Sequence, residues 1–120
     1  MVVVFTTIMT QTTNDNKYNG WTNYETWNVK LWPDNNEGSY TAWDMEAKER
    51  LENAIPEYPE LSTVRQQAII DLAGMLKEYH EEKADHLVTV IGVFADLLES
   101  ALSAVNWCEI ATAYIEDNEE

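Results

Sequence analysis

The chain has 120 residues, of which 45% are hydrophobic and 11% aromatic. This is too much apolar material for an intrinsically disordered acidic protein, and the length fits one folded domain. The chain carries 22 Asp and Glu against 7 Lys and Arg, a formal net charge of -15, which argues against unaided binding to nucleic acid or to an anionic membrane surface.

The excess negative charge lies entirely beyond Pro33. Residues 1–33 hold two acidic and two basic side chains and are therefore neutral. Lys83 is the last Lys or Arg, so every charged side chain among the final 37 residues is an Asp or Glu. The chain thus joins a neutral first part to an anionic body.

The first 17 residues are set apart from the rest by composition. Residues 1–9 are apolar, but they lack a basic segment and a small-residue cleavage site, and they are too short to span a bilayer. The lone Cys108 cannot form an internal disulfide, which is compatible with a reducing compartment. We expect a cytoplasmic protein without a membrane partner. Residues 1–17 should be a leader, flexible or forming a short strand that could pair across a homodimer, and residues 18–120 a single helical domain.

Two helices are predicted in the first half of that domain. Thr22-Asn23-Tyr24-Glu25 has the form of a capping box, with the Thr22 hydroxyl accepting from the Glu25 amide, and it predicts a helix over residues 23–32 that Pro33 ends. Asn36 or Ser39 can cap the next helix. Its expected buried stripe follows helical spacing and comprises Tyr40, Trp43, Ala47, Leu51 and Ala54.

Three more helices are predicted in the second half. Ser62 or Thr63 should begin the third, whose expected buried stripe comprises Ile69, Leu72, Leu76 and Tyr79. Residues 88–93 could be read as a strand, but apolar residues keep a helical period from Leu87 to Val105 and favour a fourth helix there. Asn106 caps the fifth. The predicted fold class is all-α, a compact bundle of about five helices.

Residues 20–27 read G-W-T-N-Y-E-T-W, and with residues 31–38 and 105–111 they resemble a family of small proteins encoded by bacteriophages, plasmids and related mobile elements. The signature G-W-T-N-Y-E-T-W defines the family, and the likeness covers about residues 18–116. The resemblance implies an origin on a mobile element and a small helical domain, and it implies no particular activity.

The aromatic residues are concentrated near the signature, with seven of thirteen between residues 18 and 43. Aromatic side chains at helical spacing usually form core, and most of these should do so. Trp and Tyr also dominate binding hot spots, so Trp27 and Trp32 are candidate anchors for a protein partner.

The acidic residues of the body have two interpretations. Carboxylates along an amphipathic helix usually form a solvated, solubilising face. A rigid helical surface of carboxylates could also imitate DNA phosphates and occupy a basic groove of a host nuclease, as small acidic phage antirestriction proteins do. The candidate residues for such a surface are Asp44, Glu46, Glu49, Glu52, Asp96, Glu99, Glu109, Glu116 and Asp117.

The sequence contains no motif typical of a metal site or of a catalytic site. His80 and His86 are six residues apart and do not share a helix face, and Cys108 lacks a partner at zinc-ligand spacing. The glycines are isolated and form no phosphate-binding loop, and no nucleophile motif is present. We therefore expect no enzyme, no catalytic residue, no metal and no cofactor.

These observations lead to two functional hypotheses. The first is a small acidic phage protein that binds and inhibits a host defence or nucleic-acid-processing protein, its partner being a basic groove. The alternative is a non-enzymatic structural or regulatory phage protein that self-associates or docks through its Trp-rich N-terminal helices. Both place the protein in the cytoplasm of a bacterial host.

Overall fold

The computed structural model describes residues 18–87 and 92–119, and in this part of the chain it is all-α. The predictions for the leader at residues 1–17 lie outside the described residues. The prediction of five helices is confirmed. They are α1 (Tyr24–Asp34), α2 (Glu37–Asn53), α3 (Val64–Leu87), α4 (Val93–Ser103) and α5 (Trp107–Asp117). No helix among these residues is long and apolar enough to cross a membrane.

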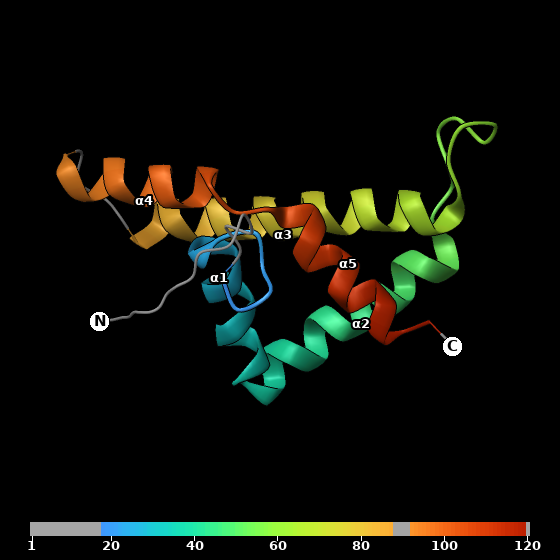
Figure 1. Cartoon of the computed structure of the whole chain (residues 1–120), viewed down its shortest axis with the longest axis horizontal. Helices are drawn as coiled ribbons and strands as arrows, with labels where there is room; N and C mark the ends of the chain where they lie inside the picture. The colour runs from blue at the N-terminus through green and yellow to red at the C-terminus, as the bar shows by residue number, and fades with distance from the viewer. Residues whose placement is uncertain (1–17, 88–91, 120) are drawn as a thin grey trace.

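The longest helix, α3, contacts α2, α4 and α5 (Figure 1). α2 and α5 pack on α3 and on each other, α1 packs on α2 and α5, and α4 lies along the C-terminal part of α3. The core forms where α2, α3 and α5 meet, and it buries apolar side chains at helical spacing. Its fully or almost fully buried members are Ala47, Ala68, Leu72, Ala73, Leu76, Val105, Ile110, Ala111, Tyr114 and Ile115.

Polar N-caps explain where most of the helices begin. The side chains of Asn36, one of the two caps predicted for its helix, and of Asn106 accept hydrogen bonds from the backbone N–H groups of residues three positions further on. Thr63 and Gln66 form a reciprocal capping box before α3.

The predicted cap of the first helix was wrong by one residue. Asn23, not Thr22, caps α1, because the Asn23 side-chain oxygen accepts from the backbone N–H of Thr26 at 2.9 Å. The helix also continues through Pro33 to Asp34. The N–H of Asn35 donates to the carbonyl of Leu31 at 3.1 Å and so completes the last turn despite the proline.

The fourth helix also differs from the prediction. Instead of one helix from Leu87 to Val105, α3 runs on to Leu87 and α4 begins at Val93. Gly92 between them has a φ of 144°, a backbone conformation that favours glycine and is incompatible with a helix. α4 has no buried residue, and Phe94 is 78% exposed although it belongs to the apolar helical period between Leu87 and Val105.

A buried lysine attaches α1 to α5. Lys30 is only 7% exposed, and its ammonium group lies 4.5 Å from the ring centroid of Tyr114. The same group donates to both carboxylate oxygens of Asp34, at 2.6 and 2.7 Å. The ion pair and the aromatic ring together compensate for the loss of solvent around the charge.

Candidate functional site

The two most distinctive segments of the sequence meet in a network of hydrogen bonds. The buried hydroxyl of Thr26 donates to the side chain of Asn23 at 2.6 Å and accepts from the backbone N–H of Asn106 at 2.8 Å. The Asn23 side chain also donates to the carbonyl of Ala104 at 2.7 Å. The start of α1 is thereby tied to the turn that precedes α5.

A second set of contacts reinforces this junction at its outer edge. The backbone N–H of Thr22 donates to the carboxylate of Glu109 at 3.0 Å, and the Asn106 amide donates to the Thr22 hydroxyl at 3.3 Å. Glu109 was a candidate for the DNA-mimicking surface, and this bond gives its carboxylate a structural role. The G-W-T-N-Y-E-T-W signature and the V-N-W-C-E segment therefore join the start of α1 to the start of α5.

The two tryptophans predicted as anchors lie in different surroundings on α1. Trp27 is half-buried in an aromatic cluster, with its ring centroid 5.0 Å from that of Tyr18 and 5.6 Å from that of Tyr24. Trp32 is 67% exposed. Trp32 has the exposure that an anchor requires, whereas Trp27 packs against its neighbours.

The four candidate carboxylates of α2 do not form one row. Asp44 is half-buried and accepts from the side chain of Asn118 at 3.0 Å, next to the end of α5. Glu46, Glu49 and Glu52 line a shallow depression together. Arg50 lies 4.0 Å from Glu46 and 3.4 Å from Glu49, so part of the negative charge is neutralised within the helix itself.

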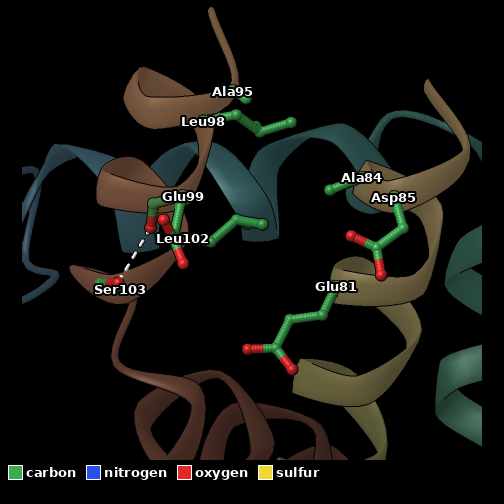
Figure 2. Close-up of a pocket in the computed structure, with 8 residues that line it drawn as sticks. All are labelled: Glu81, Ala84, Asp85, Ala95, Leu98, Glu99, Leu102 and Ser103. Atoms are coloured by element: carbon green, nitrogen blue, oxygen red, sulfur yellow. Dashed lines mark hydrogen bonds between the residues drawn. The ribbon is translucent and has the colours of Figure 1, made fainter. Parts of the chain in front are cut away.

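A groove of about 440 Å³ separates α3 from α4, and we call it the α3–α4 groove. Figure 2 shows Glu81 and Asp85 on the α3 wall and Glu99 on the α4 wall, with the side chains of Leu98 and Leu102 between them. Of the residues that the structure describes, no Lys or Arg lines this groove. It combines an apolar floor with a negative rim.

Two of the residues predicted for the acidic surface, Glu99 and Asp96, stand differently toward this groove. The Ser103 hydroxyl donates to the backbone carbonyl of Glu99 at 2.8 Å (Figure 2). This bond does not involve the Glu99 carboxylate. The predicted residue Asp96 is exposed in the first turn of α4 and does not line the groove. The structure therefore brings Glu99 together with two carboxylates of α3 that the sequence did not single out.

A second groove, of about 480 Å³, lies between α2 and α3, and we call it the aromatic groove. Trp43 and Tyr79 line it, with their ring centroids 5.4 Å apart and their planes at 85°. Three carboxylates also line it, those of Glu46, Glu78 and Glu82. Among these, only Glu46 was a candidate from the sequence, because Glu78 and Glu82 stand in a charged segment that resembles an ordinary solvated helix end.

Two titratable groups beside these features have altered pKa values. Burial lowers the pKa of His80, whose Nδ1 lies 2.7 Å from the carbonyl of Leu76 and donates to it in the neutral ring. The negative charge of Asp117 raises the pKa of Tyr40, and partial burial and Asp44 act in the same direction. Both groups are uncharged at neutral pH.

The possible metal ligands lie apart in the described part of the chain. Within residues 18–87 and 92–119 no three His, Cys, Asp or Glu side chains are placed to hold a metal ion together. Cys108 is exposed and free, on the outer side of α5. The grooves therefore offer negative charge and apolar surface, which are the properties of a binding site for a cationic group.

Comparison with known proteins assigns the chain to a family. It belongs to the family described as a family of unknown function (DUF7249), whose model matches residues 14–119. No curated protein and no solved structure matches the chain.

Proposed function

We propose that this member of the DUF7249 family is a binding protein that occupies a basic groove of a bacterial defence or nucleic-acid-processing protein and thereby inhibits it. The observation that carries the proposal is the pair of carboxylate-rimmed grooves on either side of the C-terminal half of α3. The resemblance of its signature to proteins of phages and plasmids supports an origin on a mobile element and action in the host cytoplasm.

The charge of the chain supports a basic partner. A net charge of -15 produces a negative field that attracts cationic surfaces and repels nucleic acid. Within the described residues, Glu81, Asp85 and Glu99 take part in no ion pair. Their charge is therefore available to a partner, unlike that of Glu46 and Glu49 beside Arg50.

Imitation of DNA is the specific form of inhibition that we propose. Glu78, Glu81, Glu82 and Asp85 follow each other along α3. Because an α-helix rises about 1.5 Å per residue, the four carboxylates from Glu78 to Asp85 span about 10.5 Å of the axis, an average of about 3.5 Å between successive charges. One strand of duplex DNA carries a phosphate every ~3.4 Å of helix axis, a comparable spacing. A cleft that binds the phosphate backbone could accept this helix.

Affinity capture from a bacterial host, followed by binding measurements with the purified target, tests the proposal. We expect affinity to fall steeply between low and high NaCl concentrations. The double variant Glu81→Gln/Asp85→Asn should bind at least about tenfold more weakly, because rim charges set the attraction.

The matched control changes the same total charge at a different place. Glu57 and Glu60 are exposed in the connection between α2 and α3, and Glu57→Gln/Glu60→Gln should leave binding nearly unchanged. Equal weakening by both double variants would reduce the effect to net charge, and a complex insensitive to salt would refute the proposal.

The exposure of Trp32 supports a second candidate function, docking of a phage structural or regulatory partner, or of a second copy, through α1. Under this alternative, Trp32→Ala abolishes complex formation while the circular dichroism of the helices stays the same. If the complex survives this substitution and responds to salt, the first function stands and the second fails.

A further inference from the structure

The aromatic groove combines three properties that together specify a ligand. It is open to solvent, its walls are aromatic and apolar, and its rim carries carboxylates from two helices. Carboxylates alone would indicate only a solvated surface, and aromatic rings alone would indicate only an incompletely packed part of the core. Their combination in one cavity of about 480 Å³ matches the chemistry of a cation with a flat, weakly hydrated face.

The aromatic wall is held rigidly from the interior. Trp43 packs against the core, and its ring lies nearly parallel to that of His80, with an interplanar angle of 15° and centroids 6.5 Å apart. His80 in turn lies 5.2 Å from the Trp107 ring. Since Trp43 lines the groove and His80 does not, Trp43 stands between the interior and the groove.

The neighbouring ring already interacts with a cation of the protein itself. The Lys83 ammonium lies 5.5 Å from the centroid of Tyr79. Lys83 does not line the groove, and among the described residues no other Lys or Arg does so. The groove thus offers carboxylates to a cation from outside.

The carboxylates stand where they can hold such a cation on both sides. Glu78 and Glu82 are one helical turn apart on α3, and Glu46 belongs to α2 on the opposite wall. Glu78 and Glu82 form no ion pair within the described residues, so they supply the free negative charge, whereas Glu46 shares its charge with Arg50 at 4.0 Å and closes the opposite wall.

We infer that the aromatic groove binds an arginine side chain of a basic partner segment, with the guanidinium between the rings and the carboxylates. Arginine fits better than lysine because its planar, weakly hydrated group stacks on aromatic rings and donates to two carboxylates at once. The inference rests on the proposed function, because it names the group of the basic partner that this protein recognises.

Titration of the isotope-labelled full chain with short capped peptides, followed by NMR, tests the inference. The probes are an Ala-Arg-Ala peptide and the same peptide with lysine or with citrulline, which keeps the shape of arginine but carries no charge. We expect the arginine peptide to shift the indole N–H signal of Trp43 in a saturable way. The lysine peptide should bind more weakly, and citrulline should leave the signal unchanged.

Variants assign the effect to the groove. Glu78→Gln/Glu82→Gln should weaken arginine-peptide binding at least about fivefold, whereas Glu57→Gln/Glu60→Gln should not. Tyr79→Phe should retain binding and Tyr79→Leu should lose most of it, because only the first keeps the ring. Tyr79 is 45% exposed, so neither substitution removes core.

The outcomes separate this inference from the proposed function. Shifts confined to the α3–α4 groove, or equal shifts with citrulline, would overturn the arginine site. If the captured target binds in a salt-dependent way but the arginine peptide leaves Trp43 unchanged, only the inference fails. If the peptide binds and no salt-dependent target exists, the proposed function fails and the arginine site stands.

Discussion

At the scale of single residues, the side chain of Thr26 has a larger structural role than its size suggests. It is fully buried, and its hydroxyl joins the cap of α1 to the turn before α5. Valine has nearly the same shape but no hydroxyl, so Thr26→Val leaves the backbone N–H of Asn106 and the Asn23 side chain without this partner. We expect the free energy of unfolding to fall by about 1–3 kcal/mol, measured by urea unfolding and circular dichroism.

A serine at the same position supplies the control. Thr26→Ser keeps the hydroxyl and removes only a methyl group, so it should cost less than Thr26→Val despite creating the larger cavity. If serine proves the more destabilising of the two, packing of the methyl group rather than the hydrogen bonds holds the junction.

His80 should make stability depend on pH. Because burial lowers its pKa below the ordinary value of about 6.5, the unfolded chain takes up a proton at a higher pH than the folded chain. Above that range His80 is neutral in both states and contributes no pH dependence. As the pH falls from 7.5 to 5.5, the free energy of unfolding should lose the contribution of the neutral ring, by at most about 1.4 kcal/mol per pH unit.

The carboxylates also titrate toward low pH, so the effect of His80 is measured as a difference. His80→Asn keeps a side-chain N–H that can donate to the carbonyl of Leu76 but does not titrate. We expect the stability difference between the wild-type protein and this variant to shrink as the pH falls. A difference that stays constant from pH 7.5 to 5.5 would show that His80 has the same pKa in both states.

At the scale of elements, α4 and α5 form a natural pair for comparison, because each has 11 residues. α5 buries four residues in the core, namely Ile110, Ala111, Tyr114 and Ile115. α4 buries none, and its main packing partner among the described helices is α3. We expect the amides of residues 97–103 to show hydrogen-exchange protection at least about tenfold lower than those of residues 111–117, because opening α4 exposes little apolar surface.

Two other exchange patterns would contradict the lower protection expected for α4. Equal protection of the two helices, unchanged by dilution, would mean that α4 opens only when the whole domain unfolds. Protection of α4 that rises with protein concentration would mean that a second copy covers Phe94 and its exposed neighbours.

Local signals account for the parts of the fold that the sequence could predict. Asn36, Thr63 and Asn106 cap their helices through contacts within three residues, so the chain itself reveals these starts. The boundary at Gly92 was missed because apolar residues keep a helical period across it. Periodicity reports which residues share a face, and it does not report whether a neighbour covers that face.

The candidate site could be predicted only in part, for a different physical reason. Carboxylates on α2 and α4 were recognised, but each groove needs a second wall, and α3 supplies it in both cases. Glu78, Glu81, Glu82 and Asp85 look like a solvated helix end until α2 and α4 are placed beside them. The hydrogen bonds between residues 22–26 and residues 104–109 likewise depend on tertiary packing.

At the scale of the whole molecule, the uneven distribution of charge has an energetic consequence. Every unit of excess negative charge lies after Pro33, and most of the acidic residues there stand on the helices α2 to α5. Compaction brings these carboxylates together, and the resulting repulsion opposes folding. The ion pairs of Arg65 with Glu116 and Glu119 act in the opposite direction, but they are exposed to solvent and weak.

Because 22 acidic residues face only 7 basic ones, repulsion should outweigh these attractions, and salt should stabilise the folded state. We expect the Tm, followed by circular dichroism, to rise by several degrees when NaCl is raised from about 20 mM to about 500 mM, since the Debye length falls well below the size of the domain. Sodium chloride is preferable to sulfate, which would also strengthen apolar burial. Arg65→Gln removes the inter-element ion pairs, so its Tm should rise more steeply with salt than that of the wild-type protein. A Tm that falls with NaCl in the wild-type protein and stays flat in Arg65→Gln would show instead that these ion pairs dominate the electrostatics of the fold.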